Sequence, residues 1–302
     1  MPFGAGELPA ALDTGSDLVI IVSHPGPGCY SDRNSKEVWV SDERPAPSGV
    51  DPTKPNAARI YNYLLGGKDN YEADRVVAKR MLSIAPDNRT VAWFSREFLT
   101  GSAKLAAEAG IRQFVDIGSG IPTSPSVHEA ITAIDPAARL ASIDYDPVVF
   151  AHTNAMYNGI PGVKTMLGDF RDPDDIIDRL PTEAGIDLSQ PIAILLVGVL
   201  HFVLEHERPA EMMARFHDAM APGSYVAFTH GATESDETWV TQTVTDTVGS
   251  TAQFVFRSRA DVAAIFKGFE MLEPGVAPIQ HWLGDDLPET RMVVIGGICR
   301  KP

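Results

Sequence analysis

The residues best placed to do chemistry form the run Val115-Asp116-Ile117-Gly118-Ser119-Gly120. An apolar stretch ends in an acid and then turns through two glycines toward a predicted helix. Glycine lets backbone approach a ligand closely, and a helix N-terminus offers N–H groups that have no partner within the helix. The third glycine of the dinucleotide fingerprint G-x-G-x-x-G is missing, because Thr123 stands there. Asp116 would also face a pyrophosphate unfavourably, so the pattern favours a positively charged ligand without phosphate.

S-adenosylmethionine (SAM) is such a ligand, since it carries an ammonium and a sulfonium. A second acid, Asp144, ends the next predicted strand 24 residues after Gly120, close to the spacing of about 20 at which an acid reaches a ribose diol. Both Asp144 and Asp146 could instead cap the helix that Pro147 begins. Capping suits Asp146 better, so we predict that Asp144 holds the ribose.

The third predicted strand ends in Gly168-Asp169-Phe170. Gly168 would let the backbone approach an adenine ring, Asp169 would accept hydrogen bonds from its amino group, and Phe170 could pack near it. The alternative is an ordinary strand-to-helix turn with an Asp cap. Acids at three successive strand ends make the ligand-binding interpretation stronger than any one of them does.

His201 follows the fourth predicted strand, beside the expected position of methyl transfer. A neutral imidazole there could take a proton from an attacking oxygen or nitrogen, which makes His201 the candidate general base. The alternative, which the sequence favours slightly, is that His201 packs structurally or positions substrate. His230, after the fifth strand, is a weaker candidate of the same kind. No His, Cys, Asp and Glu set has metal-ligand spacing, so no metal site is predicted.

An unusual run, Asn62 to Arg75, contains Gly66-Gly67 within a helical pattern. Each glycine costs about 1 kcal/mol in a helix interior relative to alanine, so a break is expected here. The break could lay backbone and polar side chains over a cofactor, or it could be a plain helix–turn–helix corner.

Strand and helix patterns alternate from residue 111 onward, which predicts an α/β fold with a mostly parallel sheet and helices on both faces. Residues 1–55 are rich in Pro and Gly and form a predicted, partly disordered extension. Residues 56–110 should form a helical cap over the ligand edge, and 111–302 the core. The predicted strands are Gln113–Ile117, Leu140–Ile143, Val163–Leu167, Ile192–Val197, Tyr225–Thr229, Phe269–Leu272 and Met292–Ile298, with a further short strand considered at Leu18–Val22.

The composition restricts the possible partners. A net charge of −15 and a pI near 4.9 argue against nucleic acid or an anionic membrane as substrate, because phosphate binding needs a basic surface. The two cysteines, Cys29 and Cys299, lie far apart, which fits a reducing cytoplasm. The longest apolar runs are too short to span a bilayer. A small-molecule substrate is therefore expected; the oligomeric state is left open.

At these residues the chain resembles class I SAM-dependent methyltransferases, and more closely the actinobacterial S-adenosyl methyltransferase family, formerly a domain of unknown function. The matching segments are residues 61–71 with Asp74-Arg75, 116–123 with 127–129, 143–147, 168–170 and Leu200-His201. The resemblance implies a Rossmann-like, seven-stranded sheet of order 3-2-1-4-5-7-6 with the seventh strand antiparallel. It implies that Asp116, Gly118 and Gly120 line the methionine end, that Asp144 holds the ribose, and that Asp169 and Phe170 meet adenine. It also favours Tyr63, Gly67 and Asp69 as residues that close over the cofactor.

The sequence therefore predicts SAM-dependent methyl transfer to an unidentified small molecule. A non-catalytic protein of the same fold that binds SAM or S-adenosylhomocysteine is the first alternative, because no side chain in the pattern is indispensable for catalysis. An NAD-dependent oxidoreductase is the second, although Thr123 and Asp116 count against it.

Overall fold

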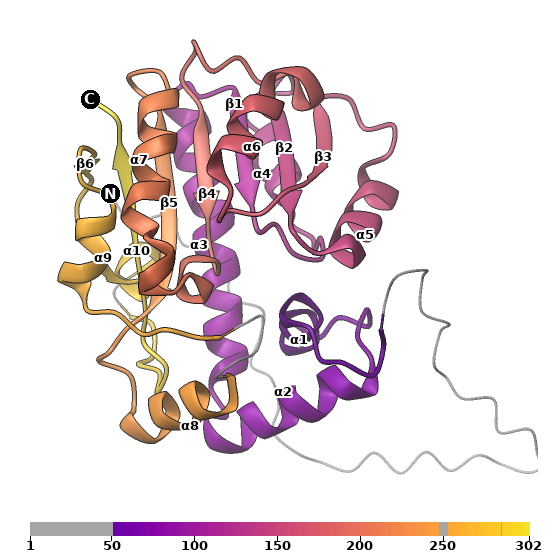
Figure 1. Cartoon of the computed structure of the whole chain (residues 1–302), viewed down its shortest axis with the longest axis vertical. Coiled ribbons are helices and arrows are strands. Elements are labelled where there is room, and N and C mark those ends of the chain that lie inside the picture. The colour runs from indigo at the N-terminus through magenta and orange to yellow at the C-terminus, as the bar shows by residue number, and fades with distance from the viewer. Residues whose placement is uncertain (1–50, 248–252, 285) are drawn as a thin grey trace, which may run out of the picture. The chain divides into compact units, whose positions relative to one another are not determined.

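The computed structural model describes residues 51–247, 253–284 and 286–302. Most of the predicted N-terminal extension, including the strand considered at Leu18–Val22, lies outside these residues. The described chain contains one mixed β-sheet with helices on both faces (Figure 1).

Seven strands form the sheet in the order β3-β2-β1-β4-β5-β8-β6. The first five of these, β3, β2, β1, β4 and β5, run parallel to one another. β8 runs antiparallel to β5 and β6. β8 is the seventh predicted strand, so the predicted order is confirmed; a short eighth strand, β7, also pairs with β8. The strands are β1 (Gln113–Ile117), β2 (Arg139–Asp144), β3 (Val163–Leu167), β4 (Ala193–Leu196), β5 (Tyr225–Gly231), β6 (Glu270–Met271), β7 (Ala277–Pro278) and β8 (Val294–Arg300).

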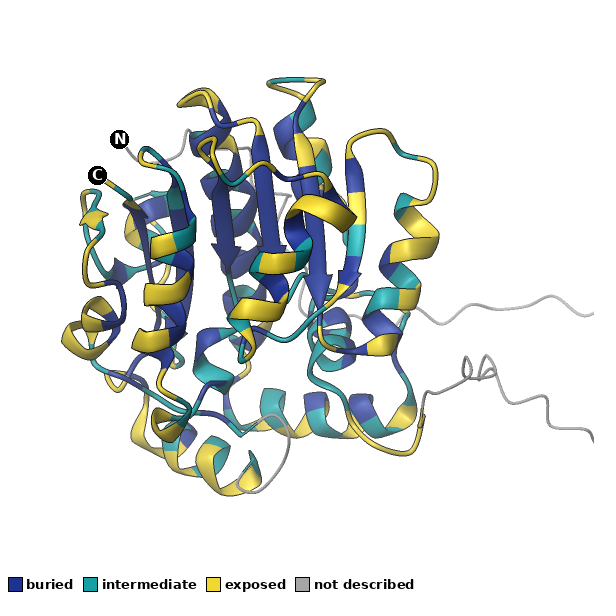
Figure 2. Ribbon diagram, turned by 45° about the horizontal axis from the view of Figure 1, so that its top comes forward, coloured by how far each residue is buried: buried dark blue, intermediate teal, exposed yellow. Residues whose placement is uncertain are grey.

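Two apolar clusters cover the two faces of this sheet, because side chains alternate along each strand. One cluster packs α6, α7 and α9 against one face, and the other packs α3, α4 and α10 against the opposite face. The central strands are buried from end to end (Figure 2). The helices are α1 (Ala57–Leu64), α2 (Glu72–Ile84), α3 (Asn88–Glu108), α4 (Val127–Thr132), α5 (Pro147–Tyr157), α6 (Pro173–Arg179), α7 (Pro209–Ala219), α8 (Glu237–Thr247), α9 (Arg259–Ile265) and α10 (Gln280–Leu283).

The three N-terminal helices do not share one environment. Figure 1 shows α1 and α2 beyond the carboxyl ends of the strands, where a cap was predicted. By contrast, α3 runs along the sheet, and its Phe94 and Phe98 belong to the same apolar cluster as Phe114 of β1. The division into cap and core remains a prediction, and α3 belongs by its contacts to both parts.

Candidate functional site

The glycine turn lies at the carboxyl end of β1 and is tied to β2 by backbone hydrogen bonds. The N–H groups of Gly118 and Ser119 donate to the carbonyl oxygen of Ile143 at 2.8 and 3.0 Å. Gly118 and Gly120 have φ angles of 71° and 65°, a region that glycine adopts without strain. A Cβ at Gly118 would overlap Val199, whereas one at Gly120 would meet no atom within 4 Å. The turn is thus packed on one side and has open space on the other.

This asymmetry predicts different outcomes for two matched substitutions. Gly118→Ala should lower the free energy of unfolding by about 2–4 kcal/mol, because left-handed backbone strain adds to the clash with Val199. Gly120→Ala carries only the backbone strain, about 1–2 kcal/mol, but its methyl group fills space proposed for the cofactor. Urea unfolding and S-adenosylhomocysteine titration of both variants check this. Equal stability of the two variants would contradict the packing described for Gly118.

Asp144 is fixed against the glycine turn by its own carboxylate. Its Oδ2 accepts the Gly120 N–H at 2.9 Å, and its Oδ1 accepts the Asp146 N–H at 3.0 Å. Burial raises the pKa of Asp144 to about 6, and these two backbone hydrogen bonds oppose the shift. Asp146 caps α5 through the Val148 N–H, as predicted for this second acid. Of the two acids, Asp144 is therefore the one whose carboxylate contacts the glycine turn.

Asp116, at the end of β1, is a buried carboxyl that makes no hydrogen bond to another described residue. Burial raises its pKa to about 7, the charge of Arg96 opposes this, and the charge of Asp144 adds to it. Ionising such a group in an apolar environment is costly unless a positive group arrives. The position therefore suits a cationic ligand group.

The third strand end differs from the sequence expectation in part. The Asp169 carboxylate binds Arg171 through both oxygens, at 2.8–3.0 Å. Phe170 is buried in the core and stacks on Phe216, with ring centroids 5.7 Å apart. Its predicted contact with adenine is not supported by this position, because its ring packs against protein. Gly168 lies close to Ile143 and Ile176, and its N–H donates to the carbonyl of Asp144.

Tyr145 is the exposed aromatic ring at this edge, with 44% of its surface accessible. It directly follows Asp144, and the guanidinium of Arg171 lies 5.6 Å from its ring centroid. Tyr145 was not among the predicted site residues, although an aromatic residue directly after the acid that ends β2 is a sequence signal for such a site.

His201 lies in the segment after β4, among aromatic rings. It stacks on Phe254 at a centroid distance of 4.2 Å and meets Phe202 edge-on at 4.3 Å. Burial, aided by His230 and Arg257, lowers the pKa of His201 well below its usual range. The ring is consequently neutral at physiological pH, and the same shift makes it a weaker base than an exposed histidine.

His230 is less suited to act as a base, because both ring nitrogens are engaged. Its Nδ1 lies 2.8 Å from the carbonyl of Gly231, and Nη1 of Arg257 lies 2.8 Å from its Nε2. Arg257 also donates to the carbonyl oxygens of Leu200 and Val203. His230 and Arg257 therefore hold the segment that carries His201.

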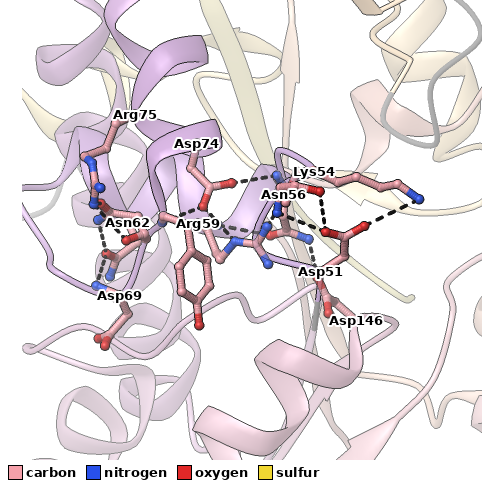
Figure 3. Close-up of polar contacts among 12 residues, drawn as sticks. Asp51, Lys54, Asn56, Arg59, Asn62, Asp69, Asp74, Arg75 and Asp146 are labelled. Atoms are coloured by element: carbon pink, nitrogen blue, oxygen red, sulfur yellow. Dashed lines mark hydrogen bonds and ion pairs between the residues drawn. The ribbon is translucent and has the colours of Figure 1, made fainter. Parts of the chain in front are cut away.

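The helices α1 and α2 form a unit fastened by a buried ion pair (Figure 3). Nε of Arg59 lies 2.8 Å from Oδ2 of Asp74, and the two side chains are 4% and 0% exposed. The Asp74 carboxylate also accepts the N–H groups of Asn56 and Tyr71, each at 2.8 Å. Asn56 in turn donates to Asp146, two residues after Asp144. The unit is thus attached directly beside the predicted ribose site.

The Gly66-Gly67 break is built around Asn62. Oδ1 of Asn62 accepts the Asp69 N–H and the Asn70 side chain at 3.0 and 3.1 Å, and a Cβ at Gly67 would overlap Asn62. This packing explains the glycine without a ligand, which favours the helix–turn–helix alternative for Gly67. The guanidinium of Arg89 lies over the ring of Tyr63 at 5.2 Å. Contacts of Tyr63, Gly67 and Asp69 with a cofactor remain predictions.

Three buried polar atoms in this region have no hydrogen-bond partner: Arg96 Nε, Ser119 Oγ and His201 Nδ1. Unpaired buried groups are rare in folded proteins and call for an explanation. Together with the open space at Gly120, they fit residues that receive part of a polar ligand. Within the described ranges no group of three or more acidic, His or Cys side chains could hold a metal ion, and no helix there is long and apolar enough to cross a membrane.

The sheet order, the glycine turn and the acid at the end of β2 define a class I, SAM-dependent methyltransferase fold. The family model described as S-adenosyl methyltransferase matches residues 43–302, and the chain belongs to this family.

Two solved structures are similar over most of the chain. One is a protein from Thermobifida fusca YX with a provisional methyltransferase assignment, 34% identical, TM-score 0.77, covering 87% of this chain and 99% of its own. The other is a DUF574 family protein from Streptomyces avermitilis, 31% identical, TM-score 0.76, covering 82% and 98%. No curated protein matches the chain. Because the matched family is described as S-adenosyl methyltransferase, SAM is the cofactor of the family.

Proposed function

We propose that this protein transfers the methyl group of SAM to a small-molecule acceptor at the carboxyl ends of β1, β2 and β4. The observation that carries the proposal is the hydrogen bond from the Gly120 N–H to the Asp144 carboxylate, at 2.9 Å. It sets the acid at the end of β2 against the glycine turn, the arrangement used for ribose recognition in nucleotide-binding folds. The net charge of −15 favours a small acceptor over a nucleic acid.

Each residue of the site has a proposed task. Asp116, Gly118 and Gly120 line the methionine end, Asp144 holds the ribose hydroxyls, and Tyr145 offers its ring face to adenine. Bound SAM supplies a methyl group activated by a sulfonium. The chain aligns the acceptor and excludes water. His201 takes a proton when the acceptor is a hydroxyl or phenol.

The test is a screen of SAM with phenols, amines, carboxylates and thiols, with release of S-adenosylhomocysteine as the readout and duplex DNA and RNA as comparison substrates. Release with a small molecule supports the proposal. Release with nucleic acid alone contradicts it. Binding of SAM without release on any acceptor would favour the non-catalytic alternative.

With a hydroxyl acceptor, His201→Ala should lower kcat by about 100-fold or more, the usual contribution of a general base, and leave SAM affinity unchanged. His206→Ala, an exposed histidine on the same segment, serves as the matched control and should retain full activity. Full activity of His201→Ala would show that His201 only packs or positions substrate.

Cofactor affinity should depend on the ionisation of Asp116. With a pKa of about 7 in the free protein, this carboxyl must lose its proton to face the ligand ammonium. Lowering the pH from 7.5 to 6 should therefore weaken S-adenosylhomocysteine binding by about five- to tenfold. Isothermal titration at several pH values measures this, and Asp116→Asn should remove the dependence that Asp116 contributes.

The same pKa shift predicts the opposite trend for stability. The pKa of Asp116 rises from 3.8 to about 7 on folding, so the ligand-free protein loses stability as the pH rises from about 4 through about 7. Asp116→Asn should flatten that part of the stability curve. A stability curve that keeps the same slope in the variant would contradict the assignment.

A further inference from the structure

Arg96 is a buried cation at the junction of the cap and the glycine turn. It projects from α3 and is 9% exposed. Its Nη2 donates to the carbonyl oxygens of Thr123 and Pro125, the latter at 2.8 Å. These two bonds hold the segment that follows Gly120.

The guanidinium of Arg96 forms no ion pair with an acidic side chain in the described part of the chain. Among the residues that the structure describes, no carboxylate oxygen lies within 4.0 Å of its guanidinium, and its buried Nε has no hydrogen-bond partner. Burying a charge is costly unless it is paired and hydrogen-bonded. Two carbonyl oxygens satisfy part of the guanidinium, and an anion would satisfy the rest.

The position of Arg96 indicates which anion. Burial raises the pKa values of Asp116, Tyr61 and Tyr157, and the charge of Arg96 opposes the rise in each case. Arg96 therefore lies near the end of β1, the cap helix α1 and the end of α5 together. The guanidinium of Arg96 and the carboxyl of Asp116 are both buried and close enough for their charges to interact. They form a pair suited to the two charges of an α-amino acid.

We propose that Arg96 binds the carboxylate of the methionine part of the cofactor, opposite the Asp116 that faces its ammonium. Guanidinium and carboxylate match in geometry and form charge-assisted hydrogen bonds. This inference rests on the proposed cofactor site and adds the residue that recognises the amino-acid end. No sequence signal marks Arg96, because it lies 20 residues before Asp116 and outside the glycine turn.

The test compares SAM with decarboxylated SAM, which lacks only the carboxylate, by isothermal titration at 0.15 M salt. The salt screens the long-range effect of the additional positive charge on decarboxylated SAM near an acidic protein. The full-length wild-type chain should bind SAM about 10- to 100-fold more tightly, in line with charged hydrogen bonds. Equal affinity for the two ligands would overturn the proposal without any variant.

Arg96→Met should reduce the ratio of the two affinities to within about twofold, mainly by weakening SAM. Arg96→Lys keeps the positive charge and should retain part of the ratio of the two affinities. If Arg96→Met fails to fold, the ratio measured for Arg96→Lys is the test, and a ratio equal to that of the wild-type protein would contradict a role for the guanidinium. Arg89→Met is the matched control, because Arg89 lies on the same helix and contacts the cap at Tyr63 and Leu64. It should leave the ratio unchanged.

The outcomes separate this inference from the proposed function. If Arg96→Met weakens both ligands equally, Arg96 only holds the Thr123–Pro125 segment and the inference is wrong, while the cofactor site stands. If the wild-type protein binds neither ligand, the proposed cofactor site fails, and the inference with it.

Discussion

Replacing Asp144 with asparagine is expected to weaken S-adenosylhomocysteine binding by about 100-fold or more. The carboxylate accepts backbone N–H groups on both oxygens and retains acceptor capacity for two ribose hydroxyls. Hydrogen bonds to a charged acceptor contribute about 1.5–3 kcal/mol each. In Asp144→Asn, an NH2 group replaces one of the two carboxylate oxygens. This group donates hydrogen bonds, so one backbone N–H loses its acceptor and the ribose hydroxyls lose the charged acceptor.

The fold should survive this change. Burial raises the pKa of Asp144 to about 6, so the folded protein holds the ionised carboxylate at a cost that asparagine removes. Asp172→Asn is the control: Asp172 also follows a strand of the sheet and caps α6, and asparagine caps helices as well as aspartate does. Isothermal titration and thermal unfolding of both variants distinguish binding from folding. Equal losses of affinity in the two variants would contradict the ribose assignment.

Breaking the ion pair between Arg59 and Asp74 is expected to have the largest effect on stability. Asp74→Asn leaves the Arg59 guanidinium buried without its counter-charge and weakens the bonds to the N–H groups of Asn56 and Tyr71. Removing one partner of a buried ion pair costs about 3–5 kcal/mol. Because the pair fastens α1 to α2, the loss should appear as release of residues 56–84.

Hydrogen exchange followed by mass spectrometry would locate this effect. In Asp74→Asn, amides of α1 and α2 should exchange about 100-fold faster or more, while those of β1 and β4 change less. Glu72→Gln removes the charge that Glu72, an exposed residue of α2, presents to Arg75; such a pair contributes about 0–1 kcal/mol, so this variant serves as control. Unchanged protection of α1 and α2 in Asp74→Asn would show that the pair does not hold the cap.

Much of the fold could be predicted because the strands are short, apolar and separated by clear turns. β1 and β3 have the predicted bounds, and α5 begins at Pro147 as predicted. The missed elements, β7 and α10, are two and four residues long and gain their structure from packing on β8, as in the bond from Trp282 to the Gly296 carbonyl. Such short segments have too few residues for a periodic pattern.

The site could be predicted where a residue type and a strand end coincide, as for Asp116 and Asp144. It could not be predicted where tertiary packing decides a role. Phe170 turns into the core to stack on Phe216, and Asn62 explains Gly67 through a contact within the cap. Arg96 enters the site from a helix whose sequence shows only an apolar face.

Binding of SAM by the glycine turn and Asp144 is the basis of the proposed function. Its most direct test is thermal unfolding of the wild-type and Asp144→Asn proteins with SAM, S-adenosylhomocysteine and NAD. A ligand at 100 times its Kd adds about 2.7 kcal/mol of stability. The wild-type protein should show a clear rise in Tm with SAM and S-adenosylhomocysteine and none with NAD, and the variant should show at most a small rise with any of the three. A rise with NAD alone, or an equal rise in the variant, would contradict SAM binding at this site.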